Sequence, residues 1–351
     1  MVCGVLWLSN GAKCNNHNRT GLRRLMMISF YDMPEMTEEL AAVNRHIERL
    51  CHSNNASMRK VIDWILEARG KQIRPILTLL CAKLKDKKVD VTEMAAIIEI
   101  CHTASLVHDD IIDNADERRG QLSVQKKFGR EMAVYAGDFM IFVTLGRTEL
   151  RLKPWYRDMF QKLEIMCDGE LAQFDNQYNV NISEEQYIEN ILGKTSSMFG
   201  IACGAGAYEG GCKEKERALV GDFSDNFGLI FQMRDDLMDF VCSHDVTLKT
   251  VQNDFANGYY TLPAIRTFSH PEYGEELRTI AGRMKCGQHE TEDDQRVVDL
   301  IRQADGFQYT RSKIQEYIRR AKDSLIPFQE TKAKNKLIEL VDYLWEKTPV
   351  V

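Results

Sequence analysis

Apolar residues recur at spacings of three and four along most of the chain, and this periodicity restricts the possible folds more than any other feature. Between Val91 and Asp113, the positions of Met94, Ile97 and Cys101 follow the repeat of an α-helix. Only 7 of the 351 residues are proline, so the sequence interrupts few helices. Runs that alternate like a β-strand and end in tight turns are missing from the sequence. The chain is therefore expected to be an all-α protein.

The same periodicity predicts where the helices lie. They are expected over residues 37–51, 57–68, 73–84, 91–113, 155–178, 184–208, 213–240 and from 312 to the end. The polar stretch 286–294 is expected to be a loop.

The organisation of the chain follows from linkers and repeats. Because no linker divides the chain and no repeat has a solenoid period, residues 36–351 are predicted to form a single domain. Residues 1–35 have no clear period. They are expected to be a disordered extension, or the result of a translation start assigned upstream of Met36.

The composition excludes several classes of protein. A formal net charge of -6 disfavours a general nucleic-acid partner. No stretch approaches the ~20 apolar residues of a transmembrane helix. The ten cysteines form no C-x-x-C pair and fit no zinc-binding spacing. Cysteines in apolar stretches are expected to be small core residues of a reduced, cytoplasmic protein. Examples are Cys81, Cys101, Cys167 and Cys203.

The segment from His102 to Asp113 contains three aspartates in an apolar helix. Asp109 and Asp113 lie one turn apart on one face, and Asp110 stands beside them. The flanking positions are apolar, so the helix is expected to be packed on nearly all sides and its carboxylates need a cationic partner. Oxygen ligands of this kind suit Mg²⁺, which completes its shell with water and substrate phosphates. The alternative is a solvated acidic surface, which the apolar flanks disfavour.

A second acidic group repeats this arrangement later in the chain. Asp235 and Asp239 again lie one turn apart, with Asp236 beside them, in another apolar helix. Two such groups in one helical chain are much less expected by chance than one. If they face each other across a cavity, they can hold several metal ions around one diphosphate.

Basic residues follow or precede these acidic groups at short distances. Arginine binds phosphate oxygens through two parallel hydrogen bonds, and lysine acts as a point charge. Each of these residues alone is a weak signal, but the set indicates phosphate-containing substrates. Its members are Lys71, Arg74, Arg118, Arg119, Lys194 and Lys249.

The order of these motifs resembles that of the trans-type isoprenyl diphosphate synthases, the polyprenyl synthetase family, and in particular the bacterial medium- and long-chain enzymes. The resemblance implies a single-domain helical bundle of the isoprenoid synthase type around a central cavity. The matching segments are Gly70-Lys71-x-x-Arg74-Pro75, His102, Asp109-Asp110-x-x-Asp113, Arg118-Arg119-Gly120, Ala136-Gly137-Asp138, Gly169-Glu170-x-x-Gln173, Lys194-Thr195, Phe231-Gln232-x-x-Asp235-Asp236-x-x-Asp239 and Thr261-Leu262-Pro263.

The resemblance also implies a role for each matching residue. The ligands of a site for three Mg²⁺ ions would be Asp109, Asp113 and Asp235. Supporting positions around the metals would be taken by Asp110, Asp236 and Asp239. Isopentenyl diphosphate would be bound by Lys71, Arg74, His102 and Arg119. The allylic diphosphate would be bound by Arg118, Lys194 and Lys249, and the developing cation would be faced by Thr195 and Gln232.

The implied chemistry suits these residues. Breaking the allylic C–O bond requires stabilisation of the departing diphosphate, which divalent cations and basic side chains supply. The double bond of isopentenyl diphosphate then attacks the allylic cation. Loss of a proton, with released diphosphate as a plausible base, leaves a trans product five carbons longer. Water must be excluded, because it would quench the cation.

Two positions depart from the family pattern. Tyr259 follows Gly258 where relatives often carry lysine, and Leu122 stands where proline is usual. Neither position is a metal ligand in the family. These changes are expected to affect rate and affinity more than the class of reaction.

Product length is expected to depend on the helix that ends in the first acidic group. Ala104 and Ser105, five and four positions before Asp109, are small, whereas short-chain members commonly place an aromatic residue there. Cys101, one turn earlier, is also small. At ~1.5 Å per residue, the helix from Asp109 to Ile97 spans about 18 Å. A tunnel of this length predicts a medium- or long-chain product; the alternative is that the small residues only permit close helix packing.

Several other functions share part of this pattern. A class I terpene cyclase shares the fold and the first acidic motif, but usually has a different second motif and needs no isopentenyl site. A short-chain synthase would stop at farnesyl or geranylgeranyl diphosphate. A non-catalytic subunit of a heteromeric synthase tends to lose the acidic motifs, which this chain retains. Because the family usually forms homodimers, a homodimer is expected, although some long-chain members need a second, different subunit.

Overall fold

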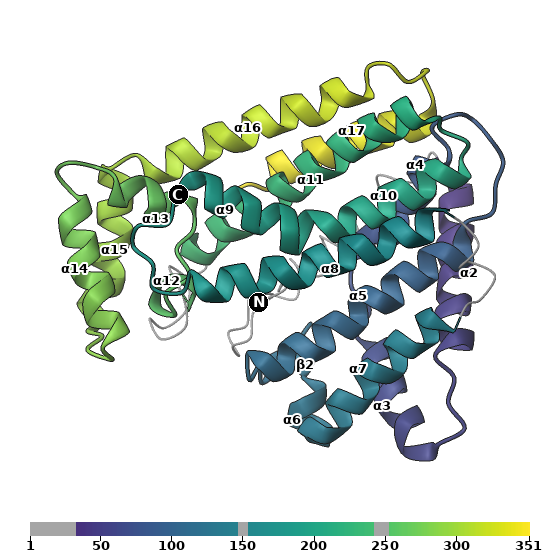
Figure 1. Ribbon diagram of the computed structural model, residues 1–351, viewed down its shortest axis with the longest axis horizontal. Coiled ribbons are helices and arrows are strands. Elements are labelled where there is room, and N and C mark those ends of the chain that lie inside the picture. Colours follow the sequence, from purple (N-terminus) through teal and green to yellow (C-terminus); the bar gives the residue numbers. More distant parts are fainter. Residues whose placement is uncertain (1–32, 147–153, 242–252) are drawn as a thin grey trace. The chain divides into compact units, whose positions relative to one another are not determined.

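The computed structural model describes residues 33–146, 154–241 and 253–351, which are built almost entirely of helices (Figure 1). The prediction of an all-α fold is therefore confirmed. Most of the predicted N-terminal extension lies outside the described residues, and so does Lys249. Within the described ranges, no helix is both long and apolar enough to cross a membrane.

The helices and strands are named in chain order. They are α2 (Pro34–Leu50), α3 (Ala56–Glu67), α4 (Ile73–Ala82), α5 (Thr92–Ile112), β1 (Glu117–Arg118), β2 (Gln121–Leu122), α6 (Val124–Phe128), α7 (Arg130–Leu145), α8 (Pro154–Asp175), α9 (Glu184–Ile191), the π-helical turn η2 (Leu192–Ser196), α10 (Ser197–Glu209), α11 (Glu214–Val241), α12 (Asn253–Ala256), α13 (Leu262–Phe268), α14 (Gly274–Lys285), α15 (Thr291–Gln303), α16 (Gly306–Leu325) and α17 (Lys332–Glu346).

Most predicted helices are confirmed within a few residues of their ends, but three predictions are wrong in part. The predicted helix 184–208 is interrupted by η2, and the predicted helix from 312 to the end is divided between α16 and α17. The predicted loop 286–294 ends at Glu290, because Glu290 and Asp293 form a capping box that starts α15.

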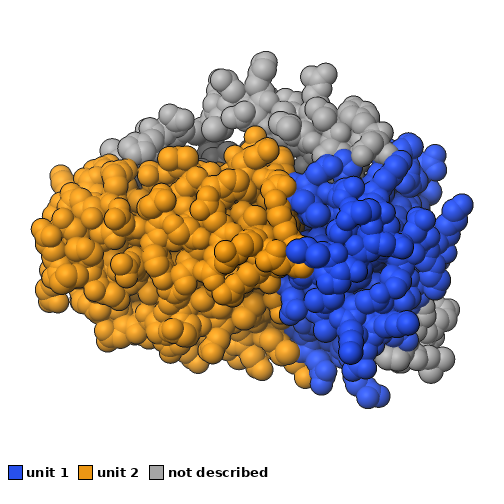
Figure 2. Space-filling model, turned by 90° about the horizontal axis from the view of Figure 1, so that it is seen from above, with its two compact units in different colours: residues 1–163, 198–224, 324–340 blue, residues 164–197, 225–323, 341–351 orange. Residues whose placement is uncertain are grey.

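Two compact units make up the described residues, each assembled from separate stretches of chain (Figure 2). Unit 1 contains the described residues of 1–163 together with 198–224 and 324–340. Unit 2 contains 164–197, the described residues of 225–323, and 341–351. The first acidic group therefore belongs to unit 1 and the second to unit 2.

Helix α5 is the central element of unit 1, where it packs against α2, α4 and α7. It begins where the Asp90 carboxylate accepts hydrogen bonds from the Thr92 backbone N–H at 2.9 Å and hydroxyl at 2.7 Å. Most of its residues are buried, and so is every residue of α4 from Arg74 to Ala82. The expectation that α5 is packed on nearly all sides is confirmed for most of the helix but is wrong for its last turn, where Ile112 is 75% exposed.

The cysteines follow the core prediction only in part. Cys81 and Cys203 are buried, and Cys101 is half-buried. Cys167 is exposed, so its prediction as a core residue is wrong. It lies on the face of α8 that also exposes Glu164 and Leu171, one turn before and after it.

Candidate active site

The C-terminal end of α5 carries the first acidic group. Asp109 and Asp110 are 4% and 2% exposed, whereas Asp113, at the end of the helix, is exposed. The backbone N–H of Asp113 donates to the carbonyl oxygen of Asp109 at 2.8 Å. The last turn is therefore helical, and it places Asp109 and Asp113 on one face, as their spacing predicts.

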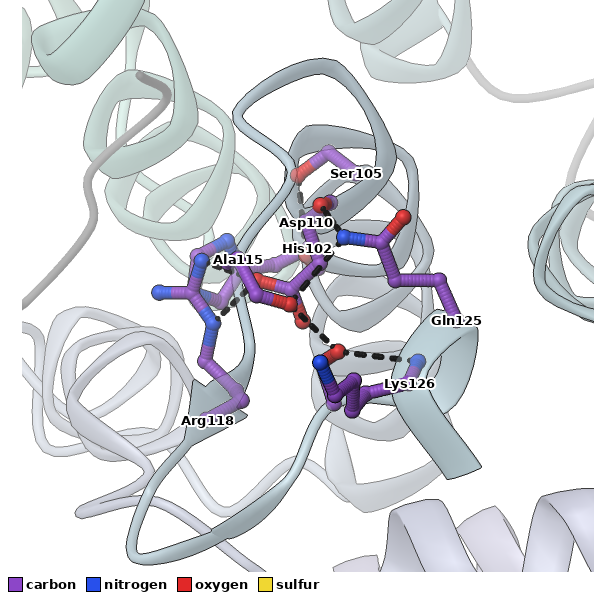
Figure 3. Close-up of polar contacts among 8 residues, drawn as sticks. His102, Ser105, Asp110, Ala115, Arg118, Gln125 and Lys126 are labelled. Atoms are coloured by element: carbon purple, nitrogen blue, oxygen red, sulfur yellow. Dashed lines mark hydrogen bonds and ion pairs between the residues drawn. The ribbon is translucent and has the colours of Figure 1, made fainter. Parts of the chain in front are cut away.

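Asp110 is bound by a basic side chain from the hairpin that follows α5 (Figure 3). Arg118 donates to Asp110 Oδ1 from Nε at 2.7 Å and also from Nη2. Burial raises the pKa of Asp110, and the hydrogen bonds from Arg118 oppose this rise. Gln125 donates to the carbonyl oxygens of Asp110 and Ala115, which holds the chain that leaves the helix.

The hairpin sends its two arginines to different partners. Its strands pair Arg118 with Gln121, and the turn residues Arg119 and Gly120 have φ values of 54° and 79°. A two-residue turn with positive φ at both positions matches the twist of a hairpin. Arg119 donates from Nη1 to the Ala68 carbonyl oxygen at 3.1 Å. The turn therefore separates the two guanidinium groups, which the sequence could only show as neighbours.

Arg74 and His102 form a buried pair in unit 1. Arg74 Nη1 lies 2.9 Å from His102 Nε2, and the two residues are 7% and 4% exposed. Burial lowers the pKa of His102 well below its ordinary value, and the charge of Arg74 lowers it further. The imidazole is therefore neutral, accepts at Nε2 and carries its hydrogen on Nδ1. Arg74 Nε and His102 Nδ1 are buried without a hydrogen-bond partner among the described residues, so two donors remain for an anion.

Glu99 lies one turn before His102 and is 6% exposed. Burial raises the pKa of Glu99, and the charges of Arg119 and Arg74 oppose this rise. A Cβ at Gly70 would lie 2.8 Å from Arg119 Cζ, so the glycine leaves room for the guanidinium group. The predicted isopentenyl residues Arg74, His102 and Arg119 thus lie around one buried carboxylate. Sequence reasoning missed Glu99, although its spacing from His102 on the helix was available.

The predicted tunnel residues occupy two environments on α5. Ile97 and Ala104 are fully buried, whereas Cys101 and Ser105 are half-buried. The Ser105 hydroxyl donates to the His102 carbonyl oxygen at 2.8 Å, so it is turned back along the helix. Because Cys101 and Ser105 are one turn apart and are followed one turn later by Asp109, they share its face.

The second acidic group lies on α11 in unit 2, and each aspartate has a different neighbour. Arg234 Nη1 donates to Asp235 Oδ1 at 3.0 Å. Asp236, 3% exposed, accepts hydrogen bonds from Tyr187 and from Gln232. Asp239 is half-buried and lies beside the carboxylate of a residue from α12 that sequence reasoning missed. That residue is Asp254, whose backbone N–H donates to Asp239.

Lys194 and Thr195 lie in the π-helical turn η2, and both are buried. A π-helical turn inserts an extra residue into a helix and is frequent at functional sites. The close approach of η2 to α8 needs a glycine in each element. A Cβ at Gly169 of α8 would lie 2.7 Å from the backbone nitrogen of Lys194, and a Cβ at Gly193 of η2 would lie 3.0 Å from Gly169 Cα. On the α11 side, a Cβ at Gly228 would lie 2.2 Å from Ser196 Oγ. The turn is therefore wedged between two helices.

The chemistry of the acidic groups fits a hard divalent cation. They offer carboxylate oxygens, which Mg²⁺ and Ca²⁺ prefer. Asp239 Oδ2 is buried without a hydrogen-bond partner among the described residues. Burial raises the pKa of Asp239 well above its ordinary value, and the neighbouring Asp254 raises it further. A cation bound here would stabilise the charged carboxylate and satisfy the buried oxygen.

Comparisons with known proteins support one assignment. Over 314 residues the chain is 26% identical to heptaprenyl diphosphate synthase component 2 of Bacillus subtilis (strain 168), covering 89% of each chain. A decaprenyl diphosphate synthase from Rhodobacter capsulatus superposes with a TM-score of 0.84 at 26% identity, over 90% of this chain and 98% of that one. A polyprenyl synthase from Caulobacter crescentus CB15, complexed with calcium and isoprenyl diphosphate, gives 0.80 at 27% identity, over 89% and 96%. Because the polyprenyl synthetase family model matches residues 55–301, the chain belongs to the polyprenyl synthetase family.

Proposed function

We propose that this prenyltransferase condenses isopentenyl diphosphate with an allylic diphosphate, such as farnesyl or geranyl diphosphate, to make a medium- or long-chain trans-polyprenyl diphosphate. The observation that carries the proposal is the buried Arg74–His102 pair beside Arg119, with two donors left for an anion. A terpene cyclase has no use for a second diphosphate site of this kind. Lys71, at the start of the same segment, is the remaining proposed contact to isopentenyl diphosphate.

The metal site is proposed to hold Mg²⁺, as three ions together with bound diphosphate. Asp109, Asp113 and Asp235 are the proposed ligands. The ions would supply positive charge to the departing diphosphate. The Caulobacter crescentus relative supports a divalent cation, because it was crystallised with calcium and isoprenyl diphosphate.

The remaining polar residues are proposed to serve the allylic substrate. Arg118, Lys194 and Lys249 are the candidates for binding its diphosphate. Arg118 is already paired with Asp110, which orients its guanidinium group. Thr195 and Gln232 are proposed to face the allylic cation, and released diphosphate is the proposed acceptor of the proton.

Incubation with Mg²⁺, labelled isopentenyl diphosphate and farnesyl diphosphate tests the reaction, with sizing of the dephosphorylated products. A ladder that ends beyond four isoprene units supports the proposal. A product that ends at three or four units would instead identify a short-chain synthase. No elongation of farnesyl, geranyl or dimethylallyl diphosphate by the pure chain would contradict an independently active enzyme, and would point to a missing second subunit.

Product length is expected to fall when the small positions four and five residues before Asp109 on α5 are filled. Ala104→Phe and Ser105→Phe should each shorten the main product by at least one isoprene unit, because the ring would occupy the path of the growing chain. Ala104→Ser adds little volume and is the control, for which the ladder should be unchanged. Chromatography of the dephosphorylated products measures the outcome. Unchanged ladders for both phenylalanine variants, in folded protein, would show that the chain grows elsewhere.

We also propose that the chain forms a homodimer through α7. Tyr135 and Phe142 on this helix are 63% and 64% exposed and stand two turns apart, which leaves an aromatic strip. Light scattering should give twice the 40.4 kDa of one chain, and Phe142→Glu should lower the mass. A wild-type mass of one chain would contradict the homodimer. The name of the Bacillus subtilis relative, component 2, makes a second, different subunit the alternative.

A further inference from the structure

A chain of hydrogen bonds in unit 2 joins η2 to the second acidic group. The Thr195 hydroxyl donates to Gln232 Oε1 at 2.9 Å, and Gln232 Nε2 donates to Asp236 Oδ1 at 2.8 Å. The other carboxylate oxygen, Asp236 Oδ2, accepts from the Tyr187 hydroxyl at 2.5 Å. Tyr187, Thr195 and Asp236 are 5%, 0% and 3% exposed, so protein groups set these bonds.

The direction of each hydrogen bond follows from Asp236, because both of its carboxyl oxygens accept. A carboxylate has only acceptors, so Gln232 must present its NH₂ group to Asp236 and its oxygen to Thr195. The Thr195 hydrogen is then committed to Gln232. What the Thr195 hydroxyl offers toward any further neighbour is oxygen lone pairs, which carry partial negative charge.

The direction of the hydrogen bond from Tyr187 to Asp236 is also fixed by a second neighbour of the Tyr187 hydroxyl group. The backbone N–H of Leu262, at the start of α13, donates to the Tyr187 hydroxyl oxygen, so the hydroxyl hydrogen is left for Asp236. Burial raises the pKa of Tyr187 well above its ordinary value, and Asp236 raises it further, so the hydroxyl remains a donor. This contact gives the segment Thr261-Leu262-Pro263 a physical role that the sequence motif alone did not explain.

We propose that Tyr187 is a positioning residue that holds the Asp236 carboxyl group through its hydrogen bond to Oδ2, and through Gln232 orders Thr195 so that it presents oxygen to the developing allylic cation. The inference rests on the proposed function, because it assumes that Thr195 faces that cation. It assigns Asp236 to this chain of hydrogen bonds, since both of its oxygens accept from protein donors. Without the Tyr187 hydroxyl, Asp236 Oδ2 loses its donor, and the carboxyl group is free to rotate. Gln232 can then turn its amide and reverse the bond to Thr195.

A double-mutant cycle between Tyr187 and Thr195 tests this coupling. Tyr187→Phe removes only the hydroxyl, and Thr195→Val keeps the shape of the side chain but removes the group being ordered. The single-turnover rate of condensation is the readout, because product release limits kcat in many enzymes. We expect Tyr187→Phe to lower this rate about 10-fold in the wild-type background and less than about 2-fold in the Thr195→Val background. The KM for isopentenyl diphosphate should change less than about 2-fold, since Tyr187 orders groups for the cation.

Tyr309→Phe is the matched control. The Tyr309 hydroxyl also donates to a carboxylate in unit 2, Glu184 Oε2 at 2.6 Å. It makes no hydrogen bond to Asp236, Gln232 or Thr195. The control should leave the single-turnover rate within about 2-fold of wild type. If Tyr187→Phe does not fold, the isosteric Asp236→Asn replaces it in the same cycle, because its NH₂ group would force Gln232 to reverse.

The outcomes separate the inference from the function on which it rests. The positioning role is supported if Tyr187→Phe lowers the single-turnover rate less in the Thr195→Val background than in the wild-type background. Equal losses in both backgrounds, or no loss in either, overturn it while leaving the transferase assignment intact. A wild-type chain that elongates no primer contradicts the independently active enzyme proposed above, and the inference that rests on it.

Discussion

Asp109→Asn is expected to lower the single-turnover rate of condensation about 10³-fold, which corresponds to about 4 kcal/mol of transition-state stabilisation. The substitution keeps the size of the side chain but removes one negative charge from a residue that is 4% exposed at the end of α5. If Asp109 is a metal ligand, the loss weakens the positive charge that stabilises the departing diphosphate. The rate should be measured at several Mg²⁺ concentrations, because weaker metal binding would raise the Mg²⁺ concentration that the variant needs for its maximal rate.

Asp116→Asn is the control for this experiment. Asp116 follows the same acidic group, but its side chain is 67% exposed and pairs with Lys126 at 2.8 Å. Exposed pairs of this kind contribute at most about 1 kcal/mol, so its rate should remain near that of wild type. A folded Asp109→Asn variant that keeps more than about a tenth of the wild-type rate would contradict the metal-ligand role.

Arg74→Met is expected to raise the KM for isopentenyl diphosphate about 100-fold, equivalent to about 2.7 kcal/mol, with little change in the KM for the allylic substrate. Methionine keeps the apolar part of the side chain but lacks the guanidinium group, whose Cζ lies 4.7 Å from the ring centroid of Phe199. It removes the charge, the bond to His102 Nε2 and the buried Nε donor. Steady-state kinetics with each substrate varied in turn would measure the two constants.

Arg69→Met separates this effect from a general loss of positive charge. Arg69 lies in the same segment, but it pairs with Glu48 and donates to the Leu66 carbonyl oxygen. Its substitution should change the KM for isopentenyl diphosphate less than about 3-fold. Equal increases for both substrates with Arg74→Met would show that Arg74 supports the whole site and does not bind one diphosphate.

The fold class and the long helices could be predicted from sequence because they depend on local periodicity. Helices α5 and α11 lie within one or two residues of their predicted bounds, since a continuous apolar pattern with few prolines leaves the backbone no better way to satisfy its hydrogen bonds. Helices α6 and α7 and helices α12–α15 were missed. The short hairpin of β1 and β2 was also missed, because two-residue strands have no periodicity to detect.

The candidate site could be predicted to the level of residue type and spacing. Asp109 and Asp113 share a face because they are one turn apart, which any helix ensures. The sequence could not show that the neighbouring arginines have different partners. Arg118 binds Asp110 and Arg119 binds the Ala68 carbonyl oxygen, because a turn with positive φ values directs the two side chains differently.

The sequence alone determined an all-α chain with two groups of aspartates and basic residues suited to diphosphates, because these features depend on composition and on the 3.6-residue repeat. Which polar groups are buried together depends on how the helices pack against one another. Glu99 beside Arg119, Asp254 beside Asp239 and Tyr187 against Asp236 are pairs from different elements. Such contacts form when helices close around a core and polar groups that lose water must find partners across it, so their physical cause is packing, which no local spacing records.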